Sequence, residues 1–150
     1  MKTKNNHGRT KKKRIEVPSQ ELAHNEENED FLEKLVHRGL GSIHPTVQNR
    51  FHRITLVNYG KTERLTIDFD VQFQNFETGK RADVGPLVII ELKRDGNVYS
   101  PILPLLRALR IKASGFSKYC IGSCITNKSL KQNIFKPRLV RLGKLAHTNL

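Results

Sequence analysis

Residues 63–73 read Glu-Arg-Leu-Thr-Ile-Asp-Phe-Asp-Val-Gln-Phe, and apolar and polar side chains alternate through the whole stretch. A period of two places every apolar side chain, from Leu65 to Phe73, on one face of a β-strand. The other face would be wet, with one arginine and two carboxylates. This pattern is typical of an antiparallel sheet with one solvated face, and it also fits a barrel with a charged, water-filled interior. The stretch predicts a sheet and leaves these two architectures open.

The composition predicts one basic domain with a polyanionic partner. The chain has 150 residues, with 27 Lys and Arg against 14 Asp and Glu, a formal net charge of +13. Such a charge points to nucleic acid, polyphosphate, a nucleotide or an anionic membrane surface. No apolar run approaches the length of a membrane span, and two cysteines are too few for a disulfide scaffold. We therefore expect a cytoplasmic protein.

The segments around the opening stretch predict an α+β fold. Residues 45–59 are rich in β-formers, although Arg50, His52 and Arg53 interrupt their alternation, and a tight turn at 59–62 would join them to the opening stretch as a hairpin. We expect a loop over 75–85. We also expect strands at 11–17 and 87–93, and helices from 29 to Gly39 or Gly41 and at 101–109. Residues 116–125 are expected to form a second helix or a half-buried segment.

Glu91 is the residue that most needs an explanation. It comes at the end of the apolar strand 87–93, and Lys93 follows on the same side. Because a buried, unpaired carboxylate is costly, either cations neutralise Glu91 or it binds a metal. In the second case it would be a single oxygen ligand for Mg²⁺ or Mn²⁺ beside substrate phosphates. The candidate phosphate ligands around it are Arg53, Arg64, Lys93 and Lys118.

A rival pattern uses the same strand. Asp83 or Asp68, followed by Glu91-Leu-Lys93, resembles the Asp…Glu-x-Lys arrangement of metal-dependent nucleases, in which two carboxylates hold the metal. Cys120 and Cys124 lie one helical turn apart, and without a second ligand pair we expect core packing rather than zinc. The chain has no P-loop, dinucleotide fingerprint or nucleophile elbow, so no nucleophile or general base is assigned.

Several short strings occur in one order over residues 45–122. They are Pro45-Thr46-Val47, Arg53, Arg64-Leu65-Thr66-Ile67-Asp68, Ile90-Glu91-Leu92-Lys93, the leucine-rich segment 101–109, and Phe116-Ser117-Lys118-Tyr119 followed by Gly122. Together they resemble the polyphosphate-polymerase (VTC) domain of the vacuolar transporter chaperone family, a branch of the triphosphate tunnel metalloenzymes. The resemblance implies an antiparallel β-barrel, or tunnel, whose charged lumen binds ATP and inorganic polyphosphate.

By motif position, the resemblance implies roles for individual residues. Arg53 and Arg64 would hold phosphates, Glu91 would bind Mn²⁺ or Mg²⁺, Lys118 would contact the phosphate chain, and Lys93 would be a lumen lysine. Lys12 and Arg14 match a further basic strand of the family. The implied reaction is transfer of the terminal phosphoryl group of ATP to a growing polyphosphate. That chemistry depends on positioning and charge neutralisation more than on a covalent nucleophile.

The chain departs from the family pattern at its N-terminal side. Family domains begin with further strands that carry their own ligands, and these strings are missing here. We therefore expect a disordered basic N-terminus over 1–10 and, over 11–150, the C-terminal part of the domain with an incomplete barrel. Such a chain would be inactive alone, unless a protein partner or a second copy completes the barrel. A non-catalytic polyphosphate- or nucleotide-binding module and a general nucleic-acid-binding domain remain the alternatives to the enzymes.

Overall fold

The computed structural model divides the chain into two compact units, Met1–Pro45 and Thr46–Leu150. The residues that it describes are 2–4, 10–12, 30–31, 34, 44–96 and 99–147. In the first unit, strand β1 (Lys2–Lys4) pairs antiparallel with β2 (Thr10–Lys12). Strand β1 lies inside the stretch for which we predicted disorder, and β2 overlaps the predicted strand 11–17. The helix predicted from residue 29 falls largely outside the described residues.

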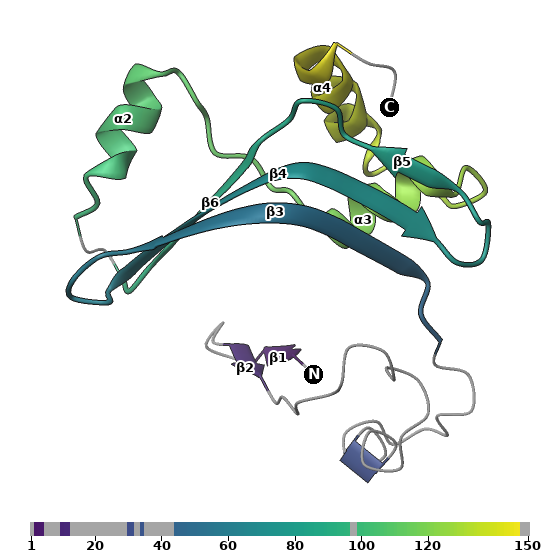
Figure 1. Cartoon of the computed structure of the whole chain (residues 1–150), viewed down its shortest axis with the longest axis horizontal. Helices are drawn as coiled ribbons and strands as arrows, with labels where there is room; N and C mark the ends of the chain where they lie inside the picture. The colour runs from purple at the N-terminus through teal and green to yellow at the C-terminus, as the bar shows by residue number, and fades with distance from the viewer. Residues whose placement is uncertain are drawn as a thin grey trace. The chain divides into compact units, whose positions relative to one another are not determined.

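The second unit is built on a four-stranded antiparallel sheet, drawn in blue to teal in Figure 1. Its strands are β3 (Val47–Val57), β4 (Glu63–Asn75), β5 (Arg81–Asp83) and β6 (Ile89–Arg94). Strand β4 is central: β3 pairs along one edge, and β5 and β6 follow one another along the other edge. The α+β class with an antiparallel sheet is confirmed. The sheet formed by the described residues is open and does not close into a tunnel.

The hairpin predicted around the opening stretch is confirmed. In the connection between β3 and β4, the Asn58 side chain accepts a hydrogen bond from the Glu63 amide at 3.0 Å and donates one to the Thr62 hydroxyl at 2.9 Å. Lys61 adopts a left-handed conformation, with φ of 53°. The loop predicted over 75–85 contains the short strand β5, which the sequence did not predict because Arg-Ala-Asp has no strong β-former.

A β-bulge at Asp70 divides β4 into two halves. Arg50 lies opposite Gln72 while His52 lies opposite Phe69, so three steps along β4 match two along β3. Asp70 is the extra residue, with a left-handed φ of 52° that an aspartate tolerates better than most residues. The side chains of β4 therefore change faces at this point.

The prediction that all apolar residues of this strand share one face is wrong. The three before the bulge (Leu65, Ile67 and Phe69) lie on one face, and Val71 and Phe73 lie on the other, together with Asp68. Alternation in the sequence continues unbroken through Asp70, so it could not reveal that one residue there leaves the pairing.

Three helices follow the sheet: α2 (Ile102–Ala108), α3 (Lys118–Thr126) and α4 (Lys136–Ala146). Helix α2 confirms the helix predicted at 101–109, and α3 shows that residues 116–125 form a helix. Helix α2 buries none of its residues and stands apart from the sheet in Figure 1. Helix α3 packs on the sheet, and the buried core that it forms with the sheet and α4 consists of Val71, Phe73, Val84, Ile121, Cys124, Ile125 and Leu139.

Helix α3 lies very close to the sheet because residue 122 is glycine. A β-carbon built on Gly122 would come within 2.4 Å of Cδ1 of the buried Phe73 ring. Ser117 begins the helix, and its hydroxyl accepts a hydrogen bond from the Cys120 amide at 3.3 Å. At the other end, the Gln132 side chain donates to the carbonyl groups of Cys124 and Asn127, both at 2.9 Å. At its N-terminus, Lys118 of α3 contacts Asp68 in the middle of β4. Within the described residues, no helix has the length and hydropathy needed to cross a membrane.

Candidate phosphate-binding site

The cross-strand register brings the predicted site residues to one face of the sheet. Along the half of β4 before the bulge, Arg53 pairs with Asp68, while Arg64 pairs with Lys93 and Thr66 with Glu91. Arg64 and Thr66 lie on the same face of β4 as Asp68, because every second residue of a strand points to the same side. Lys118 of α3 contacts Asp68 on this face. We call this surface the charged face; it consists of Arg53, Arg64, Asp68, Glu91, Lys93 and Lys118.

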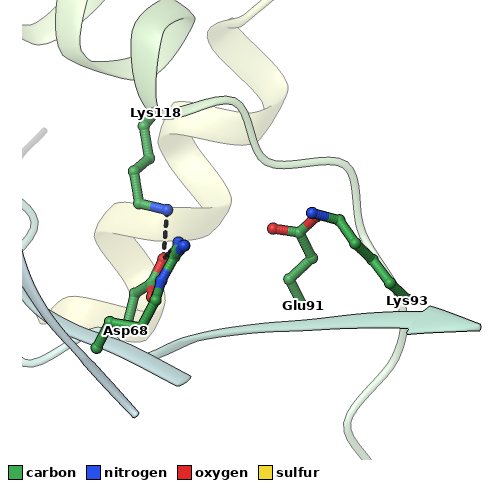
Figure 2. Close-up of polar contacts among 5 residues, drawn as sticks. Asp68, Glu91, Lys93 and Lys118 are labelled. Atoms are coloured by element: carbon green, nitrogen blue, oxygen red, sulfur yellow. Dashed lines mark hydrogen bonds and ion pairs between the residues drawn. The ribbon is translucent and has the colours of Figure 1, made fainter. Parts of the chain in front are cut away.

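Asp68 is the centre of the charged face. Arg53 donates to its carboxylate in bidentate fashion, with Nε 2.6 Å from Oδ1 and Nη2 2.7 Å from Oδ2. The Lys118 ammonium donates to the same Oδ2, as the dashed line in Figure 2 shows. The Asp68 side chain is only 1% exposed, and both cations remain more accessible. Asp68 therefore joins β3, β4 and α3 through one buried carboxylate.

The protonation of this cluster follows from these contacts. The hydrogen bond from Arg53 is the main cause that lowers the pKa of Asp68 below its ordinary value, and Lys118 lowers it further, while burial acts in the opposite direction. The same hydrogen bond raises the pKa of Arg53, with a smaller contribution from the charge of Glu91. Asp68 is therefore ionised, and Arg53 keeps its positive charge.

The aromatic ring of Phe51 contacts the same two cations, Arg53 and Lys118. Its ring centroid lies 4.9 Å from the Arg53 guanidinium carbon and 4.5 Å from the Lys118 ammonium nitrogen. Cation–π contacts of this kind restrict a flexible cation to one orientation and add a modest attraction. Phe51 also packs against the core. The orientation of Arg53 and Lys118 is thus connected to the packing of α3.

Glu91 makes a more open ion pair. Its Oε1 lies 3.0 Å from the Lys93 ammonium, and both side chains are about half exposed, at 49% and 54%. Figure 2 shows Glu91 and Asp68 projecting from the sheet toward the same side. Of the two alternatives for Glu91, the structure therefore shows the one in which a cation neutralises the carboxylate. The ion pair uses Oε1, which leaves Oε2 for a further ligand.

The donor set fits a metal held mainly by its substrate. Among the residues that the structure describes, no three His, Cys, Asp or Glu side chains group together as a metal site would require. Asp68 is occupied by two cations, so Glu91 would be the single protein carboxylate. Mg²⁺ and Mn²⁺ accept such sites when phosphate oxygens and water complete the coordination. The metal role of Glu91 stays a prediction of this kind.

The nuclease arrangement is not formed. Asp83 pairs with Gln72, whereas Ala82 pairs with Phe73, so Asp83 lies on the face opposite to Phe73 and Asp68. Glu91 lies on the same face as Asp68. Asp83 and Glu91 therefore point away from each other across the sheet. The other candidate, Asp68, is neutralised by Arg53 and Lys118 and lacks the free oxygens of a metal ligand.

The remaining candidates lie elsewhere. Lys12 is in β2, in the unit Met1–Pro45, and Arg14 falls outside the described residues. Cys120 and Cys124 are free thiols, and Cys124 is part of the core, as predicted. Burial is the main cause that raises the pKa of the Cys124 thiol, so it stays protonated and unreactive.

Sequence reasoning missed the central position of Asp68 and the contribution of Phe51. A signal for the first existed: counted outward from the hairpin turn, Arg53 and Asp68 fall directly opposite each other, as do Val57 and Arg64. The only sequence signal for Phe51 was its position two residues before Arg53, which places both residues on one face of β3. The contact of Lys118 with Asp68 spans 50 residues, and no local pattern indicates it.

The fold and site define an α+β protein with an open antiparallel sheet and a cationic surface anchored on a buried aspartate. The model of the VTC domain family matches residues 1–127, which is most of the chain. The chain therefore belongs to the VTC domain family, and the match extends beyond the strings at 45–122. Searches among curated proteins and among solved structures gave no match.

Proposed function

We propose that the charged face binds inorganic polyphosphate and the triphosphate of ATP. The family supports a role connected with polyphosphate. The observation that carries the proposal is the arrangement of Arg53 and Lys118 around Asp68. Asp68 takes two of the five N–H donors of the guanidinium and one of the three ammonium donors, so the remaining donors of two fixed cations are available to phosphate oxygens.

The other members of the charged face would extend the same phosphate track. Arg64 and Lys93 lie directly opposite each other on β4 and β6, two residues before the Thr66–Glu91 pair along β4. Successive rows of a strand on one face are about 7 Å apart, which suits contacts with successive groups of an extended phosphate chain. Glu91, in the intermediate row, would hold Mg²⁺ or Mn²⁺ together with phosphate oxygens.

The proposed reaction is transfer of the terminal phosphoryl group of ATP to the end of a polyphosphate chain, with release of ADP. When bound, the metal would supply charge neutralisation on the phosphate oxygens. The residues of this chain would position the substrates. Arg53, Arg64, Lys93 and Lys118 would orient the phosphates, and Lys93 would also hold the Glu91 carboxylate. This division fits phosphoryl transfer, which needs alignment and electrostatic stabilisation.

A non-catalytic role in polyphosphate or nucleotide binding is the second candidate. It is favoured by the open sheet of the described residues, because water reaches an open site and weakens its electrostatic interactions. We propose that turnover requires further strands, from a protein partner or a second copy, that enclose the phosphate chain. Without them the charged face would bind its ligand and release it unchanged.

Binding and turnover are tested separately. Polyphosphate and duplex DNA of matched charge are titrated at fixed salt, since salt governs affinities of this type. We expect the R64Q/K93Q variant to bind polyphosphate at least about tenfold more weakly, by the usual strength of charge-assisted hydrogen bonds. The variant R141Q/K144Q, with the same charge loss on exposed positions of α4, is the control. Equal losses in both variants, or equal binding of DNA, would contradict the proposed site.

Turnover is measured by incubation with ATP and Mn²⁺ or Mg²⁺, with polyphosphate and ADP as readouts. Polymer formation that E91Q abolishes supports the transferase. Polyphosphate binding without any ADP release supports the binding module, for which E91Q should leave metal-free binding intact.

A further inference from the structure

We infer that Asp68 is a positioning residue for phosphate binding: it strengthens binding although it carries the same charge sign as the ligand. This inference rests on the proposed function of the charged face. The simple electrostatic expectation is the opposite, because a carboxylate in a phosphate site repels the ligand and competes for its cations. The geometry around Asp68 decides between these two effects.

The first argument is the way in which Arg53 is held. The bidentate contact uses Nε and Nη2, which lie on one edge of the guanidinium plane. The guanidinium carbon also lies over the Phe51 ring, 4.9 Å from its centroid. The second edge stays available, and the Arg53 side chain is 39% exposed. A guanidinium held in this manner presents a fixed donor edge, so little conformational entropy is lost when phosphate binds.

The second argument concerns Lys118. It is the first residue of α3, where the helix dipole is positive and a cation is disfavoured. Among the described residues, its only ion-pair partner is the Asp68 carboxylate. Without that charge, only the modest attraction of the Phe51 ring would oppose the repulsion of the ammonium by the helix end. Asp68 therefore keeps a cation close to Arg53 that the helix alone would repel.

The third argument is accessibility. Asp68 is 1% exposed, whereas Lys118 is 19% and Arg53 39% exposed. A ligand on the charged face meets the donors of the two cations before it can approach the carboxylate. The carboxylate lies behind the two cations and accepts hydrogen bonds from both. It therefore repels a bound phosphate only weakly, while it still fixes the orientation of Arg53 and Lys118.

The chain offers a matched control for a test. Asp70 is two residues away on the same strand, its side chain is 62% exposed, and its contact is with His52 at 3.2 Å. Asparagine tolerates the left-handed conformation of Asp70, so D70N preserves the bulge. D68N and D70N both raise the net charge by one, and only D68N removes the carboxylate that orients Arg53 and Lys118.

Polyphosphate affinity is measured for wild type, D68N and D70N over a range of salt concentrations. We expect D70N to bind at least as tightly as wild type, and D68N to bind about tenfold more weakly, the effect of one charge-assisted contact. The number of phosphate contacts, obtained from the slope of log affinity against log salt concentration, should also be about one lower for D68N than for wild type. Binding by D68N that equals or exceeds that of D70N overturns the positioning role and leaves the proposed function intact. Failure of wild type to bind polyphosphate overturns both.

A measurement on the unmodified protein covers the case in which D68N does not fold. The Nε–H signal of Arg53 is followed by ¹⁵N NMR during titration with polyphosphate, after assignment through the R53K variant. We expect this signal to keep its position and slow exchange, because the bond to Asp68 persists, while the Nη signals shift. Loss of the protected Nε–H signal on binding would show that the ligand displaces Asp68, and would contradict the inference.

Discussion

The two halves of β4, before and after Asp70, have the same alternating sequence and opposite environments. On the face that α3 covers, the first half presents Arg64, Thr66 and Asp68, and the second half presents Val71 and Phe73. A single bulge thus puts a charged surface and an apolar surface next to each other on one face. One helix can then use both, because α3 packs on the second half and extends Lys118 over the first.

The opposite face shows the complementary change. Its first half carries two aliphatic rows across three strands, and its second half carries two polar rows. The rows are Leu56–Leu65–Leu92, Ile54–Ile67–Ile90, Gln48–Gln74–Arg81 and Arg50–Gln72–Asp83. Strand β3 makes this change without a bulge, since its apolar residues move from odd to even positions at His52. The imperfect alternation of residues 45–59 is therefore the counterpart of the bulge in β4.

The largest effect is expected when the bulge is removed. Insertion of one threonine between Phe51 and His52 would give Asp70 a pairing partner on β3, so β4 would become regular. Val71 and Phe73 would then turn to the opposite face, or the pairing would slip, and in both cases α3 loses its contacts. We expect a loss of about 3–5 kcal/mol, comparable to truncation of a core aromatic residue, measured by urea unfolding.

The control for this insertion is D70G. Glycine accepts the left-handed conformation and keeps the bulge, so its effect should stay within about 1 kcal/mol. An insertion variant as stable as D70G would contradict the division of β4 into two halves.

The packed half is tested more finely by Gly122→Ala. Alanine has the higher helix propensity, yet its methyl group would come within 2.4 Å of the Phe73 ring. We expect destabilisation by about 1–3 kcal/mol, the usual effect of overpacking, measured by thermal and chemical unfolding. Gly115→Ala is the control, because its β-carbon would meet only the flexible Arg138 side chain, at 3.4 Å. Equal stabilities of the two variants would show that α3 lies further from the sheet.

The charged half contains a buried and an open ion pair, which should differ in their contribution to folding. Arg53→Gln weakens the main interaction of a fully buried carboxylate, and we expect a loss of about 1–3 kcal/mol. Lys93→Gln breaks the exposed pair with Glu91 and should change stability by less than about 1 kcal/mol. The comparison is made by chemical unfolding at one salt concentration, and a larger effect of the Lys93 substitution would invert our ranking of the two pairs.

The smallest effect is a pH dependence confined to the charged half. Since the pKa of Asp68 is lowered in the folded state, its ion pairs contribute their full stability above the ordinary carboxyl range. That contribution is lost as the pH falls from this range toward the lowered value, because in this interval the unfolded chain takes up a proton that the folded protein does not yet bind. The unfolding free energy of D68N should lack this decline, whereas D70N should retain it. A decline that both variants share would assign the effect to other carboxylates.

Much of the secondary structure and part of the site could be predicted from local patterns. The hairpin, the strand that ends in Glu91 and Lys93, and two helices depend on alternation, turn residues and helical spacing over short stretches. Arg53, Arg64, Lys93 and Lys118 were singled out because cations in these strings suit phosphate. Asp68 was considered only as a metal ligand, because its neutralisation depends on a lysine 50 residues away.

The sequence by itself determined that this chain forms an antiparallel sheet, carries a strong positive charge and has the strings of its family, because these properties depend on neighbouring residues and composition. Only the tertiary structure decided which face each side chain of β4 occupies and where its carboxylate finds its partners. The physical reason is that one residue in a left-handed conformation reverses the faces of a strand, and that a buried charge is stable only beside the cations that packing brings to it.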